Sequence, residues 1–465
     1  MQRILAIAFL TVRAASRYRL VVVLAALLLG MVVVLPLIIK HDGSARGFTQ
    51  ILLTYTLSMI TALLGFSTLW LACGTLARDV EECQMQMVAV KPIARWQIWL
   101  GKWLGILMVD ALLLSLSAAA VFGLMKWRAL KLPPAQQAIL TNDVLVSRGS
   151  LKEPKPDIEA DVERIFQERL KKSAVSDLDR QLLRKQTEEQ VKWQYQLVPP
   201  SMARQWRINL GLRKTSLRDQ PLFLRIKFHT PESALNPDAA KASVTYLGDW
   251  WIGPPESPQL MNKQMSLAAE TFHEFAVPPN LFDEQGILNI EFRNYNDTAL
   301  LFSLDDGLEV LYREAGFGLN FFRGVAIIFF WLALLAALGL AAASFLSFPV
   351  AAFFALGVLI VGLSSSTLST VVQEGAIFGA NHEGGKTEPT LLDHLIVPVF
   401  GLLLKVVNLV QGFSPIDSLS LGRSITWGQL GSAFVQICLL MGGIFSVIGI
   451  TIFTRRELAT AQSQH

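Results

Sequence analysis

Long apolar runs without charged residues alternate along this chain with one extended polar stretch. The first run, residues 20–39, has twenty uncharged residues, which at a rise of about 1.5 Å per residue cover a hydrocarbon core of about 30 Å. Five further runs predict five more crossings, at residues 48–76, 104–124, 324–346, 349–372 and 430–453. The pattern therefore predicts an α-helical membrane protein with six transmembrane helices.

Ionisable residues inside apolar runs are the exceptions to this pattern. Asp110, the one acid in the six runs, is expected to face a neighbouring helix instead of lipid. A seventh apolar run, residues 391–410, contains Asp393, His394 and Lys405. Because such groups cost about 2.5–3.5 kcal/mol each at membrane depth, we expect re-entrant or interfacial helices over residues 391–412 and not a seventh crossing.

Positive charges indicate the orientation. They gather before the first predicted crossing, between the second and third, and after the last: Arg3, Arg13, Arg17 and Arg19; Arg78, Lys91, Arg95 and Lys102; Arg455 and Arg456. Cytoplasmic segments carry such an excess, so both termini are predicted to be cytoplasmic, which an even number of crossings allows. Residues 127–315 are then extracytoplasmic, and the predicted location is the cell inner membrane.

The first nineteen residues predict an amphipathic helix on the inner membrane surface. Ile4, Ile7, Ala8, Thr11 and Val12 share one helical face, and the arginines lie elsewhere on the helix.

The polar stretch divides into two parts. Apolar residues recur at helical spacing between residues 157 and 194, which predicts two helices broken near Ser176. From Arg207 onward, short alternating runs such as LFLRIKF and ILNIEF predict an antiparallel β-sandwich. The predicted regions are an N-terminal membrane half at 1–126, a helical arm at 127–195, the β-sandwich at 196–315 and a C-terminal membrane half at 316–465.

Composition excludes several classes of function. Of the 465 residues, 52% are hydrophobic and 17% are charged, against about 25% charged in soluble domains. The net charge of +4 includes no dense basic stripe, so nucleic-acid binding is not expected. The six histidines have no paired ligand spacing and no nucleophile-elbow motif occurs, so we expect neither a metal site nor a catalytic site.

Residues 380–387, ANHEGGKT, fit a loose form of the phosphate-binding loop, with Ala380 in the place of the first glycine. A working loop joins a strand to the N-terminus of a helix. Here a predicted membrane helix precedes the motif and Pro389 follows it closely. We therefore expect no cofactor bound by this chain.

The most informative segment is the predicted cytoplasmic one between the second and third crossings, residues 77–102. It combines an acidic helix, a proline turn and the start of another helix, with candidate contact residues Asp79, Glu81, Glu82, Lys91, Pro92, Arg95, Trp96 and Lys102. A docking surface for a soluble partner and a plain charged loop both fit these residues.

The order of these features resembles the coupling region of ABC-2 permeases, the membrane subunits of type-2 ATP-binding-cassette exporters. The matching features are an acidic stretch after the second helix, a Pro-x-x-Arg turn and a Gly-Lys pair: Asp79, Glu81 and Glu82; Pro92 and Arg95; Gly101 and Lys102. The large insert between the third and fourth crossings departs from simple members of that family.

The resemblance implies a subunit that is not itself catalytic, partnered by a separate cytosolic ATPase that uses ATP and Mg. It also implies a homodimer or a pseudo-symmetric heterodimer with a related permease, surrounded by membrane lipid. Glu81 and Arg95 would make charge-assisted hydrogen bonds to the ATPase. The output is either export of a substrate or mechanical motion of the outer domain. The alternative is a multi-pass anchor for a glycan- or protein-binding β-sandwich, without an ATPase.

Hydroxyl groups give the fifth predicted crossing a polar half. They either line a substrate path or bond neighbouring helix turns: Ser364, Ser365, Ser366 and Thr367.

The orientation predicts where a protease reaches the chain. Protease added outside intact spheroplasts should cut between Leu151 and Gln190, because that polar segment is predicted to be extracytoplasmic. Immunoblotting of the fragments checks this result. Cleavage in inverted vesicles only would reverse the predicted orientation.

Overall fold

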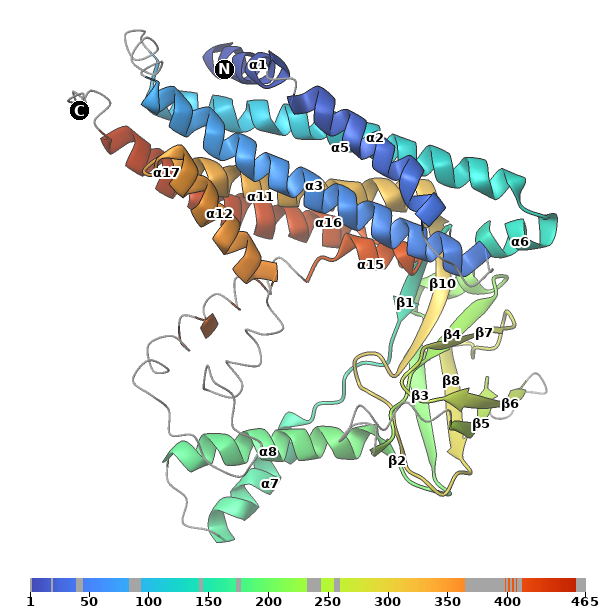
Figure 1. Ribbon diagram of the computed structural model, residues 1–465. Coiled ribbons are helices and arrows are strands. Elements are labelled where there is room, and N and C mark those ends of the chain that lie inside the picture. The colour runs from blue at the N-terminus through green and yellow to red at the C-terminus, as the bar shows by residue number, and fades with distance from the viewer. Residues whose placement is uncertain are drawn as a thin grey trace. The chain divides into compact units, whose positions relative to one another are not determined.

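The computed structural model describes residues 2–17, 20–38, 45–82, 93–141, 145–172, 177–231, 244–254, 260–363 and 412–456, with isolated positions between 398 and 407. The chain divides into two compact units. The helical unit comprises Met1–Ser147 with Ala315–His465, and the β unit comprises Arg148–Glu314. Figure 1 labels their helices and strands.

Four helices among the described residues are long and apolar enough to cross a membrane, at Thr49–Glu81, Arg95–Lys131, Phe317–Ala343 and Trp427–Arg455. They coincide with the second, third, fourth and sixth predicted crossings. Two shorter apolar helices, Val22–Leu35 and Phe348–Val361, lie in the first and fifth. The chain is therefore a membrane protein, and the count of six crossings stays a prediction.

Local sequence sets several helix boundaries. Thr426 begins its helix with a capping box, because its hydroxyl oxygen accepts from Gln429 N at 3.1 Å and the Gln429 side chain accepts from Thr426 N at 3.0 Å. Pro133 follows the third predicted crossing, and the helix there ends at Lys131. The described helices of this unit are α1 (Gln2–Arg17), α2 (Leu20–Ile38), α3 (Ala45–Glu81), α5 (Arg95–Lys131), α6 (Pro134–Ile139), α11 (Phe317–Ala343), α12 (Phe348–Leu363), α15 (Pro415–Ser420), α16 (Trp427–Ala433), the π-helix η4 (Phe434–Gly442) and α17 (Gly443–Arg455).

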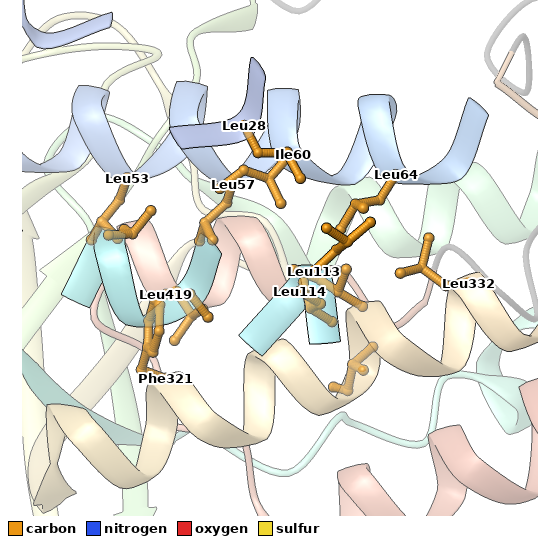
Figure 2. Close-up of a cluster of buried hydrophobic side chains, with 14 of the residues drawn as sticks. Leu28, Leu53, Leu57, Ile60, Leu64, Leu113, Leu114, Phe321, Leu332 and Leu419 are labelled. Carbon is orange, nitrogen blue, oxygen red and sulfur yellow. The ribbon is translucent and has the colours of Figure 1, made fainter. Parts of the chain in front are cut away.

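A core of leucine-rich side chains joins α2, α3, α5, α11 and α15. Figure 2 shows Leu53, Leu57 and Leu64 of α3 converging with residues of the neighbouring helices. Inside this unit, Thr68 of α3 donates a hydrogen bond of 2.9 Å to the buried Asp110 of α5. The prediction that Asp110 faces another helix is confirmed.

Two glycines bring α1 against α5, and the two helices lie side by side in Figure 1. A Cβ atom at Gly101 would lie 2.6 Å from Cβ of Ile7, and one at Gly105 would lie 2.7 Å from the carbonyl oxygen of Ala8. Only glycine permits this close approach.

This packing changes the assignment of faces on α1. The face expected to lie on the membrane surface packs on α5, with Ala8 and Thr11 buried. Leu5, Phe9 and Leu10 are exposed instead. Sequence periodicity identifies an apolar face, but it does not say whether lipid or another helix covers that face.

The described residues of the β unit form two four-stranded sheets and a short pair. The sheets have the orders β1-β10-β4-β7 and β3-β8-β5-β6, and β2 pairs with β9. Counting the eight strands of the two sheets in chain order gives 1-8-3-6 and 2-7-4-5, which is the order of a jelly roll. The strands are β1 (Val146–Leu151), β2 (Leu197–Val198), β3 (Ala203–Asn209), β4 (Leu222–Ile226), β5 (Thr245–Ile252), β6 (Met261–Ala268), β7 (His273–Val277), β8 (Ile287–Asn294), β9 (Leu300–Leu301) and β10 (Leu308–Gly316).

The two sheets share one hydrophobic core, as expected for a β-sandwich. Trp206 and Trp250 come from one sheet, and Leu224 and Val310 come from the other. Aromatic rings fill its centre, with the ring centroids of Trp250 and Phe292 4.7 Å apart. The β-sandwich predicted from the alternating runs is therefore present.

The helical arm is a pair of helices, α7 (Glu159–Lys172) and α8 (Asp177–Gln196). Tyr195 of α8 donates a hydrogen bond of 2.7 Å to Asp161 of α7, and this bond together with Arg164 lowers the pKa of Asp161. The order of elements differs from the predicted regions, because β1 precedes the arm and belongs to the sandwich. β1 has only six residues, and its buried and exposed positions alternate only in part, so the sequence pattern did not identify it as a strand.

Replacing Gly105 by leucine should separate α1 from α5. The added side chain collides with backbone and costs about 1–3 kcal/mol or more. We expect a lower midpoint of thermal unfolding for purified Gly105→Leu, measured by fluorescence-detected size exclusion after heating. The matched control is Gly123→Leu on the same helix, where a Cβ atom would meet nothing within 4 Å. Equal losses for the two variants would contradict this packing.

Candidate docking site at the charged helix ends

Charged residues tie several helix ends together at one end of the helical unit. We call this set the charged end: Arg78, Asp79, Glu81, Arg95, Lys102 and Arg456. It brings together the C-terminus of α3, the first turns of α5 and the C-terminus of α17. Side chains of the set also reach the C-terminus of α11 and the N-terminus of α12.

Lys102 and Asp79 join α5 to α3. The Lys102 ammonium group lies 2.5 Å from an Asp79 carboxylate oxygen and also donates to Thr75 O at 2.7 Å. The lysine side chain is 8% exposed and the aspartate side chain 34%. A cation this buried needs such partners, so the pair fixes the two helices relative to each other.

Arg95 joins α5 to the end of α17. Its guanidinium Nη1 donates to the carbonyl oxygens of Phe453, Thr454 and Arg456, at 3.1, 2.8 and 2.6 Å. The last carbonyls of a helix have no partner within the helix and carry the negative end of its dipole. Arg95 therefore acts as a cap supplied by another helix.

Glu81 joins α3 to the start of α12. A carboxylate oxygen of Glu81 accepts from Phe348 N at 2.8 Å, at the positive end of the α12 dipole. The Arg78 guanidinium carbon lies 4.2 Å from the centroid of the Phe348 ring. At the end of α11, Arg456 donates to Ser344 O at 3.2 Å.

The predicted contact residues thus fall into three groups. Asp79, Glu81, Arg95 and Lys102 have contacts within the chain, whereas Lys91 and Pro92 lie outside the described residues. Glu82 and Trp96 are exposed, as Glu81 also is, and Trp96 is 44% exposed in the first turn of α5. A bond from Glu81 or Arg95 to a partner protein stays a prediction, but each already bonds another helix of this chain.

Trp96 is held in a defined first turn. Gln97 N and Ile98 N both bond to Ala94 O, and the Gln97 side chain accepts from Ala94 N at 3.3 Å. A large apolar ring on such a rigid, exposed turn is the type of residue that dominates protein interfaces. We name Glu82, Ala94 and Trp96, all exposed, the outer edge of the charged end.

Other predicted sites are not placed. Three predicted features lie outside the described residues. They are the hydroxyl-bearing residues Ser364, Ser365, Ser366 and Thr367, residues 380–387, and most of residues 391–412. In the part of the chain that the structure describes, no three His, Cys, Asp or Glu side chains are grouped as metal ligands. Two residues at this site were not predicted: Arg456, a member of the charged end, and Phe348, which Glu81 and Arg78 contact. The sequence shows them only as a flanking charge and an apolar residue.

Removing either partner of the Lys102–Asp79 pair should have unequal effects. Asp79→Ala leaves a buried cation with one carbonyl partner, a change that costs about 3 kcal/mol or more in comparable buried pairs. Lys102→Met leaves a carboxylate that water reaches. We expect Asp79→Ala to lower the thermal midpoint much more than Lys102→Met, and the double variant to recover most of the loss. Equal losses from the two single variants would show that the pair is not a buried tie.

No family model matches this chain, and neither a curated protein nor a solved structure matches it.

Proposed function

We propose that this chain is the membrane-spanning permease subunit of an ATP-binding-cassette transporter, with the charged end as the surface that receives a separate cytosolic ATPase. The ATPase binds and hydrolyses ATP with Mg, and this chain converts its motion into movement of helices. The observation that carries the proposal is the combination of internal ties and an exposed outer edge in one segment, residues 77–102.

The ties give the segment a mechanical role. A push on Trp96 acts on α5 directly, on α3 through Lys102 and Asp79, and on α17 through Arg95. Glu81 extends the connection from α3 to α12. Motion at the outer edge would move these helices as a body, because several bonds would otherwise have to break. A plain charged loop needs no such set of bonds.

Two copies of this chain, or one copy and a related permease, would form the assembly, with six crossings and a cytoplasmic charged end. The output is either substrate export or motion of the β unit. One feature favours motion: β10 ends at Gly316 and α11 begins at Phe317, so no loop separates the sandwich from a membrane helix.

Trp96→Glu tests this proposal. The protein should stay folded, because Trp96 is exposed, but recovery of an ATPase with the purified membrane protein should fall. Truncating an aromatic residue at an interface centre costs about 2 kcal/mol or more, which is roughly thirtyfold in affinity. Mass spectrometry and ATP hydrolysis of the purified complex measure the recovery.

Met202→Glu is the matched control, since Met202 is an exposed apolar residue of the β unit. Arg95→Glu is a second comparison, and it should lower thermal stability as well as recovery because Arg95 caps α17. If no ATPase co-purifies with the unmodified protein, or if Met202→Glu removes it while Trp96→Glu does not, the proposal fails and the anchor alternative gains support.

A further inference from the structure

A pocket of about 310 Å³ lies among α3, α5 and α6, away from the charged end. It is formed by the first two turns of α3, the last turns of α5, and the residues that follow α5 and α6: Thr49, Leu52, Met125, Trp127, Arg128, Lys131, Leu132 and Leu140. Pockets for small ligands have volumes of about 300–1,000 Å³, so this one accommodates a small ligand or one end of a larger one.

The pocket is apolar inside. Leu52, Met125 and Leu140 are buried, and the hydroxyl-bearing Thr49 is buried beside them. A free inorganic anion would gain nothing from Leu52, Met125 and Leu140, because apolar surface offers it no hydrogen bonds. The walls therefore fit a hydrocarbon segment.

Two cationic residues complete the lining. Arg128 and Lys131 come from the last turns of α5, and none of the described residues that line the pocket is acidic. The Lys131 ammonium group lies 3.6 Å from the centroid of the exposed Trp127 ring, which holds it near the pocket. The lining therefore combines apolar walls with positive charge.

The position along α5 sets the depth of the pocket in a bilayer. From Lys102 to Lys131 the helix rises about 43 Å at about 1.5 Å per residue, close to the full thickness of about 40–45 Å that includes both head-group layers. If Lys102 lies at one surface, Lys131 reaches the head groups of the other. Trp127 agrees with this depth, because tryptophan gathers at membrane interfaces.

We propose that this pocket binds an anionic phospholipid, with the lipid phosphate against Arg128 and Lys131 and the start of one acyl chain against Leu52, Met125 and Leu140. Both parts of the lining are then used at once. The pocket volume of about 310 Å³ holds only the start of one acyl chain next to the head group. The rest of the lipid lies along the helices. This site does not depend on the proposed ATPase partner.

Native mass spectrometry of the purified full-length protein tests the site, with phosphatidylglycerol and phosphatidylcholine of identical chains as the two probes. We expect the protein to retain phosphatidylglycerol preferentially. Replacing both cations, Arg128→Gln with Lys131→Gln, should weaken its retention by at least about tenfold, since each basic residue near a lipid head group contributes to binding. Size exclusion confirms that the variant remains folded.

Lys126→Gln is the matched control, because Lys126 lies on the same helix and does not line the pocket. Leu132→Trp should displace the lipid with both cations still present. Equal retention of the two lipids, an equal loss in Lys126→Gln, or displacement of phosphatidylglycerol by millimolar inorganic phosphate would each overturn the proposal.

Discussion

The need to pair charged groups at the ends of long apolar helices constrains the rest of this protein. Lipid gives two helices little hydrophobic reason to associate, so packing and polar contacts between helices must hold them together. Lys102, Arg95 and Glu81 supply such contacts at three helix ends. Because each contact joins a different pair of helices, the charged end fixes the positions of α3, α5, α12 and α17 relative to one another.

Close backbone approach is the second means of holding these helices. Gly101 and Gly105 let α1 lie on α5, and Gly339 lets α11 approach α3, where a Cβ atom would lie 2.7 Å from Cβ of Ala72. Lys102 follows Gly101 directly in the sequence. The same turns of α5 thus hold α1 by contact and α3 by charge, and they lie just inside the exposed outer edge.

The two units solve different burial problems. In the β unit the aromatic rings of Trp206, Trp250 and Phe292 are removed from water between two sheets. In the helical unit many large apolar side chains remain exposed, which is expected where lipid covers them. The transition occurs without a loop at Gly316, where a strand gives way to a membrane helix.

The sequence by itself determined the membrane class, the positions of the long apolar helices, the presence of a sandwich and a helical pair, and the segment with mixed charges. The length of each apolar run and the spacing of its hydrophobic residues carry that information, because they depend on whether lipid, water or protein surrounds the segment. Only the tertiary structure decided that Arg95 caps α17, that Glu81 caps α12, and that the apolar face of α1 meets α5. Those contacts join residues up to 361 positions apart, and a local pattern shows that a group needs a partner without showing which distant group provides it.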